Sequence, residues 1–170
     1  FSLTEVFSNF VSSNNNIILE DFSANYLDTK INANATYSDL AKKIKGKISV
    51  YDFLVKREMM GASKFYLKDA LFDCDLSFIF DLKTNKKVMN QLSSEGECIA
   101  PSAILAGIDI DKIANRIDNL ETFQDFFDLF NKNKMAGDTT IDSINLSFKI
   151  KDSVLLVKNL TALQKNFKIL

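Results

Sequence analysis

Closely spaced aspartates are the residues of this chain whose types and spacing best suit chemistry. Asp73 and Asp75 lie two residues apart in an alternating segment, so both point to the same face of a strand. Asp125 and Asp128 lie three residues apart in a segment with helical periodicity, which also places them side by side. Such pairs can act as general acid and base, or can bind a hard cation such as Ca²⁺ or Mg²⁺.

Neither pair has the surroundings that these roles require. A hard-cation site needs several more oxygen ligands from a shaped loop, and no such loop flanks Asp73 and Asp75. Nothing in the pattern positions a general acid beside a base. The chain has no His, which excludes Ser-His-Asp and Cys-His nucleophilic systems and His-based zinc sites. We therefore predict a solvated face at Asp73 and Asp75, no catalytic or metal-binding residue, no cofactor and no enzymatic activity.

The two cysteines, Cys74 and Cys98, are too few for a structural zinc cluster or a disulfide framework. Free cysteines are commonly buried, so two buried thiols are the favoured interpretation. A disulfide between them is the alternative that an oxidising compartment allows.

Composition excludes further classes. With 170 residues, 46% of them hydrophobic, the chain has the size of one domain, residues 1–170, with a sizeable core. Lys and Arg number 21 and Asp and Glu 22, which argues against a nucleic-acid binder. No apolar run approaches the roughly 20 residues that span a bilayer. Because the sequence begins with Phe1, we expect a piece of a longer protein, with any signal or membrane anchor upstream.

The elements that must position these residues are mostly strands, because apolar and polar residues alternate with a period of two. The clearest example has one face formed by Ala70, Phe72, Cys74, Leu76, Phe78, Phe80 and Leu82. Another strand places Ile44, Gly46, Ile48 and Val50 on one face and Lys43, Lys45 and Lys47 on the other, where we expect solvent.

The period then changes to that of one long amphipathic helix at about residues 109–132. Its apolar residues from Ile110 to Phe130 recur at spacings of three and four, and Asp109 or Asp111 can cap its start. Because its polar face carries more acid than base, we expect it to pack on the sheet rather than on a membrane surface. A hairpin follows, with Ile144, Leu146, Phe148 and Ile150 on one face. The fold class is α+β, mainly antiparallel β.

The block from residue 107 to 160 resembles the C-terminal region of the AsmA-like family of bacterial envelope proteins. Its start is Gly107-Ile108-Asp109-Ile110, followed by the amphipathic segment. Gly137 and Thr139 then precede the alternating strand, with Ile141 where the family has an aromatic residue. The hairpin turn, usually Asn-Gly or Asp-Gly, is Lys151-Asp152-Ser153 here, and Val154 and Leu160 lie in the returning strand.

The resemblance implies a curved β-sheet, a groove or half-barrel, with an apolar lining. It implies a periplasmic domain anchored to the bacterial inner membrane by an upstream helix. Its implied roles are phospholipid transport between the two membranes and outer-membrane assembly, with phospholipid and envelope proteins as partners. Phe72, Leu76, Phe78 and Phe80 are the candidate groove wall. For these four residues we favour the alternative interpretation, in which they belong to a closed core covered by the helix.

A second hypothesis is a protein-interaction or assembly-scaffold module that pairs through exposed sheet edges without binding lipid. Co-purifying phospholipid favours the first hypothesis, and assembly that grows with concentration favours the second.

Overall fold

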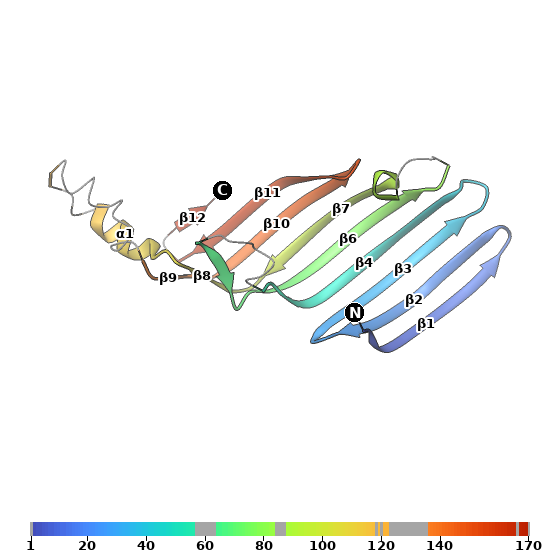
Figure 1. The fold of residues 1–170 in the computed structure, drawn as a ribbon, viewed down its shortest axis with the longest axis horizontal. Coiled ribbons are helices and arrows are strands. Elements are labelled where there is room, and N and C mark those ends of the chain that lie inside the picture. Colours follow the sequence, from blue (N-terminus) through green and yellow to red (C-terminus); the bar gives the residue numbers. More distant parts are fainter. Residues whose placement is uncertain are drawn as a thin grey trace.

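The computed structural model describes residues 2–56, 64–83, 88–117, 119, 121–122, 136–165 and 167–169. Most of this chain forms one antiparallel sheet with the strand order β1-β2-β3-β4-β6-β7-β10-β11-β12 (Figure 1). Its strands are β1 (Thr4–Ser13), β2 (Asn16–Tyr26), β3 (Thr29–Ser38), β4 (Lys43–Leu54), β6 (Leu71–Asp81), β7 (Leu92–Ala100), β10 (Ser143–Lys151), β11 (Val154–Gln164) and β12 (Phe167–Ile169). The predicted fold class, α+β with mainly antiparallel β, is confirmed.

A smaller sheet is inserted at one end of the large one. Its strand order is β5-β8-β9, and its strands are β5 (Tyr66–Lys68), β8 (Ala103–Ala106) and β9 (Asp138–Ile141). Pro101 lies between β7 and β8, where the chain leaves the large sheet. Proline has no N–H to donate to a ladder, so this position suits it. A 3₁₀ helix, Val88–Gln91, precedes β7.

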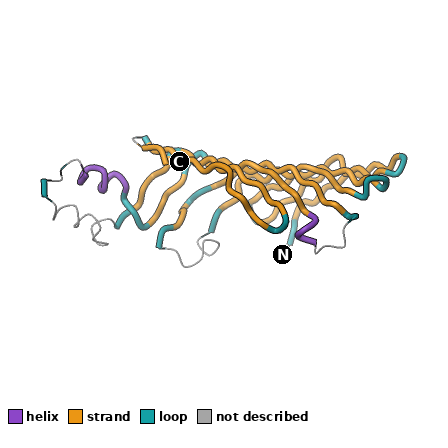
Figure 2. Tube along the Cα trace, turned by 90° about the horizontal axis from the view of Figure 1, so that it is seen from above, coloured by secondary structure: helices purple, strands orange, loops and turns teal. Residues whose placement is uncertain are grey.

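The large sheet is a single open layer, as Figure 2 shows along most of its width. Tight turns link several of its neighbouring strands, and two of these turns have positive φ at both central residues. These are Asn14 and Asn15 between β1 and β2, and Asp152 and Ser153 between β10 and β11. Positive φ at both central residues is the type I′ geometry that matches strand twist. The Asp152-Ser153 turn therefore adopts a hairpin geometry without the glycine that usually favours it.

The helix is shorter than the sequence predicts. α1 spans Ile110–Ile117, and the predicted helical residues 118, 120 and 123–132 lie outside the described residues. Asn119 explains the end of α1, because its backbone N–H donates to the carbonyl of Arg116 and its side chain donates to that of Asn115. These bonds satisfy carbonyls that the last turn leaves open.

α1 also does not cover the large sheet, contrary to the expectation of a helix packed on it. It has no buried residue, and its nearest described neighbour is β9 (Figure 1). Asp109, one of the two predicted candidates, caps the start of α1. Its carboxylate accepts a hydrogen bond from the Lys112 N–H at 2.9 Å.

Among the described residues, the closed core lies where the small sheet meets the large one. Its buried residues come from both sheets and from the link before β6, and they are Ala70, Phe72, Cys98, Ala100, Ala103, Ile141 and Ile144. Leu67 and Leu105 of the small sheet pack against them. The rest of the large sheet has no comparable second layer among the described elements.

Candidate functional site

One face of the large sheet is apolar from β2 to β11, and we call it the apolar face. Strand register places its residues in rows that cross seven strands. One row is Leu19, Ala35, Gly46, Phe78, Ser94, Ile150 and Leu155, and the next is Phe22, Ala33, Ile48, Leu76, Gly96, Phe148 and Val157. A third row is Ala24, Ile31, Val50, Cys74, Cys98, Leu146 and Leu160.

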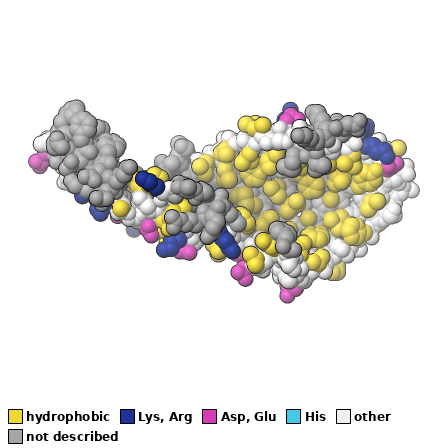
Figure 3. Space-filling model, in the orientation of Figure 1, with side chains coloured by type: hydrophobic (Ala, Val, Ile, Leu, Met, Phe, Trp, Pro, Cys, Tyr) yellow, Lys and Arg dark blue, Asp and Glu magenta, His cyan; other side chains and the backbone are white. Residues whose placement is uncertain are grey.

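The apolar face is continuous and open over most of its area. Figure 3 shows its hydrophobic side chains as one broad field, with charged side chains at the margins. The exposed fraction of its residues is high toward β11, at 60% for Leu155 and 56% for Val157. Apolar patches larger than a few hundred Å² are uncommon on soluble monomers and usually mark a binding surface.

Aromatic rings lie close against the sheet rather than standing up from it. A Cβ on Gly46 would lie 2.8 Å from Cζ of Phe78, and one on Gly96 would lie 2.9 Å from Cζ of Phe148. Each ring belongs to the residue directly across from its glycine on the neighbouring strand. The rings cover backbone that the glycines leave bare, so the apolar face stays shallow at its centre.

The four candidate groove residues divide between two environments. Phe72 is buried in the closed core, where β6 meets the small sheet. Leu76, Phe78 and Phe80 are half-buried on the apolar face, beyond that core. No described helix covers them, so the expected closed core under a helix is not formed by α1. Strand alternation predicted their shared face, and the structure separates Phe72 from the other three.

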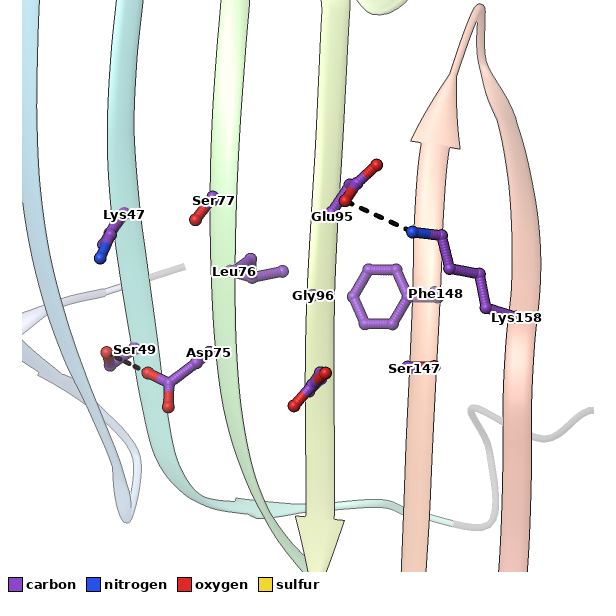
Figure 4. A pocket seen from close by; sticks show the side chains of 11 residues that line it. Lys47, Ser49, Asp75, Leu76, Ser77, Glu95, Gly96, Ser147, Phe148 and Lys158 are labelled. Atoms are coloured by element: carbon purple, nitrogen blue, oxygen red, sulfur yellow. Dashed lines mark hydrogen bonds and ion pairs between the residues drawn. The ribbon is translucent and has the colours of Figure 1, made fainter.

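The opposite face, the polar face, has a shallow hollow of about 600 Å³ across β4, β6, β7, β10 and β11 (Figure 4). Its charged side chains include Lys47, Asp75, Glu95 and Lys158. Glu95 accepts a hydrogen bond from Lys149 Nζ at 2.6 Å and pairs with Lys158 Nζ at 3.3 Å. The hydrogen bonds from Lys149 and then Lys158 hold the pKa of the Glu95 carboxyl below its ordinary value.

The predicted pair Asp73 and Asp75 lies on the polar face, and both carboxylates accept hydrogen bonds from neighbouring β4 residues. Asp73 accepts from the backbone N–H of Asp52 at 3.0 Å, and Asp75 accepts from the Ser49 hydroxyl. Asp125 and Asp128 lie outside the described residues. Within the described part of the chain, no group of three or more Cys, Asp or Glu residues is arranged to hold a metal ion.

Cys74 and Cys98 form a disulfide with an S–S distance of 2.13 Å. They are directly opposite each other on β6 and β7, with their side chains on the apolar face. The structure therefore adopts the paired alternative rather than two free thiols. Strand register is what brings the two together, and sequence separation alone does not reveal it.

The residues that carry the family resemblance form the joint between β8, α1 and β9. The Gly107 N–H donates to the Gly137 carbonyl at 2.9 Å. Thr139 is buried, and its hydroxyl donates to the Ile108 carbonyl at 2.7 Å and accepts from the Ile110 N–H at 2.9 Å. A Cβ on Gly107, where φ is +95°, would lie 2.5 Å from the Lys64 carbonyl oxygen. These residues have structural roles at a strand–helix–strand joint.

Sequence reasoning did not single out two exposed strands, β1 at one edge of the large sheet and β11, which only the short β12 flanks at the other. Both β1 and β11 expose large apolar residues on both faces, including Phe7 and Phe10 in β1 and Leu155 and Leu156 in β11. The available signal was the run Val154-Leu155-Leu156-Val157, in which four apolar residues interrupt the alternation.

Comparison with protein-family models, with curated proteins and with solved structures finds no match to this chain. Across the described residues, no helix has both the length and the apolar character needed to cross a membrane.

Proposed function

We propose that this chain is a non-enzymatic, AsmA-like periplasmic domain of a protein anchored to the bacterial inner membrane. Its role is to shelter phospholipid acyl chains during transport toward the outer membrane and so to contribute to outer-membrane assembly. The observation that carries the proposal is the apolar face, which crosses seven strands and has no described layer over most of its area.

The physical basis is burial of hydrocarbon. Each methylene group that leaves water contributes about 0.8 kcal/mol, so an acyl chain lying on the apolar face gains several kcal/mol without any specific polar contact. Such binding needs no titrating residue, which agrees with a chain that lacks His. The Cys74–Cys98 disulfide is compatible with an oxidising compartment such as the periplasm.

The test compares two neighbouring residues of β6 whose side chains lie on opposite faces. Phe78→Asp places a carboxylate on the apolar face, while Ile79→Asp places one on the polar face, where Ile79 is already exposed. We expect Phe78→Asp to weaken binding of a fluorescent fatty acid roughly tenfold or more, because a carboxylate replaces apolar surface that would cover the hydrocarbon. Ile79→Asp should leave the affinity nearly unchanged.

Both variants are first checked for an unaltered far-UV circular dichroism spectrum. The unmodified chain is also extracted with organic solvent, and co-purifying phospholipid is sought by mass spectrometry. A lipid-free protein that does not bind the fatty acid, or equal losses of affinity in both variants, contradicts the proposal.

A second candidate function is an assembly module that pairs through its sheet edges without lipid. The observation that favours it is the pair of outer strands, because β1 pairs only with β2, and β12 covers only Ala162–Gln164 of β11 among the described residues. Open hydrophobic edges are templates for pairing with another chain. Assembly of a chain that binds no fatty acid supports this second function over the first.

A further inference from the structure

The outer edges of β1 and β11 are suited to pair with each other in two copies of the chain. Eight long strands make up the sheet from β1 to β11, all in antiparallel pairs, so β1 and β11 run in opposite directions (Figure 1). A second copy shifted sideways, without rotation, therefore presents its β1 antiparallel to β11. This shift also keeps both apolar faces on the same side of the combined sheet.

The lengths of the two edges also match. β12 pairs only with Ala162–Gln164, which leaves the outer edge of β11 from 154 to 161 without a partner among the described residues. β1 has ten residues, Thr4–Ser13, and all of them are exposed. Phe10 is 64% exposed, and Leu156 of β11 is 53% exposed. A strand with apolar residues on both faces is normally buried between neighbours, so pairing would cover side chains that are otherwise in water.

The charges at the two ends of the sheet have opposite signs. The first 29 residues, which include β1 and β2, contain four acidic residues and no Lys or Arg, and these four are Glu5, Glu20, Asp21 and Asp28. From residue 143 to 165, which includes β10 and β11, there is one acidic residue, Asp152, against Lys149, Lys151, Lys158 and Lys165. Opposite charges favour pairing of unlike ends, and like charges disfavour pairing of identical ends.

We propose that the partner of each edge is a second copy of this chain, with β11 of one copy adding antiparallel to β1 of the next. This pairing does not depend on lipid binding. It joins the apolar faces of successive copies into one continuous surface. Because the two surfaces differ, the contact is heterologous and leaves a free β1 and a free β11 at the two ends. Assembly therefore continues into chains of copies rather than stopping at a dimer.

One register satisfies both the faces and the charges. It places Leu156 of one copy opposite Phe7 of the next, and both lie on the polar face. Two residues further along, Lys158, which pairs with Glu95 of its own chain, then faces Glu5, which accepts a hydrogen bond from Asn25. Each of these two residues lies where its strand has an irregular pairing with its present neighbour.

The test uses single cysteines and a bis-maleimide, which leaves the Cys74–Cys98 disulfide untouched. Chains with Phe7→Cys and chains with Leu156→Cys are treated separately and as a mixture. We expect cross-linked dimers mainly in the mixture. Ile79→Cys, an exposed polar-face residue in the middle of the sheet, is the control and should not cross-link. Sedimentation of the unmodified chain should show species that grow with protein concentration beyond a dimer.

Charge exchange tests the register. Lys158→Glu on the Leu156→Cys chain, or Glu5→Lys on the Phe7→Cys chain, should each reduce the yield of cross-link several-fold. The two changes together should restore it, an outcome that general loss of folding does not produce. Cross-linking within either single variant alone, a dimer that does not grow further, or a monomer at every concentration would overturn the proposal. These results are independent of fatty-acid binding, so the two proposals can fail separately.

Discussion

Glycines and aromatic rings lie against each other at the centre of the apolar face. Gly46 and Gly96 allow the Phe78 and Phe148 rings to lie against the backbone of the neighbouring strand. Aromatic residues across from glycines are a known way of shielding bare backbone in sheets. An open surface of this kind suits a long, flexible hydrocarbon better than a small rigid ligand, which needs a concave pocket.

Substitution of Gly46 should therefore be costly even by alanine. The added Cβ would lie 2.2 Å from the backbone oxygen of Asn34 and 2.8 Å from Phe78 Cζ, so β3 or the ring must move. We expect Gly46→Ala to lower the free energy of unfolding by about 1–3 kcal/mol, measured by urea denaturation. Lys47→Ala, on the adjacent exposed residue, is the control and should change it by less than about 0.5 kcal/mol. Equal unfolding midpoints for the two variants would show that the ring and β3 adapt freely.

At the scale of elements, Thr139 joins β9 to the start of α1. Its buried hydroxyl satisfies the Ile108 carbonyl and the Ile110 N–H together. Thr139→Val keeps the shape and removes both hydrogen bonds, which leaves two backbone groups without their partner. We expect a loss of about 1–3 kcal/mol in the free energy of unfolding.

Hydrogen exchange should locate this loss. In the Thr139→Val protein, amides of α1 should exchange faster, while those of β3 and β4 should change little. Thr140→Val, on the exposed neighbouring residue of β9, is the matched control. If the two valine variants show the same exchange rates in α1, the hydroxyl of Thr139 is not what holds the joint.

For the whole molecule, the single-layer architecture makes the Cys74–Cys98 disulfide important. Most of the large sheet has no second described layer, so its stability depends on contacts between neighbouring strands. The disulfide closes a segment with a sequence separation of 24 residues between β6 and β7. In the chain-entropy treatment, a loop of this length corresponds to about 3 kcal/mol.

Reduction should lower the stability of the protein accordingly. We expect dithiothreitol to lower the free energy of unfolding in urea by about 3 kcal/mol. The double variant Cys74→Ala/Cys98→Ala should have a low stability that reductant does not alter further. A native protein whose urea midpoint is unaffected by reductant would mean that the disulfide contributes little.

The sequence by itself determined which residues share a face, because alternation fixes the side of a strand on which a side chain lies. It thereby placed Leu76, Phe78 and Phe80 together and predicted the β10–β11 hairpin. Helical periodicity offered Asp109 or Asp111 as the cap, and the structure uses Asp109. Apolar periodicity continues past Asn119, whereas the described helix α1 ends at Ile117 and Asn119 hydrogen-bonds to carbonyls of its last turn.

The tertiary structure alone decided what lies opposite each face. Periodicity shows that a strand has an apolar side, but not whether another layer covers that side. Three short strands separate into a second sheet and bury Phe72, while the rest of the apolar face has no described cover. Strand order also made Cys74 and Cys98 neighbours and placed β1 at one edge of the sheet, with β11 and the short β12 at the other. These relations join residues distant in the chain, so local sequence patterns do not contain them.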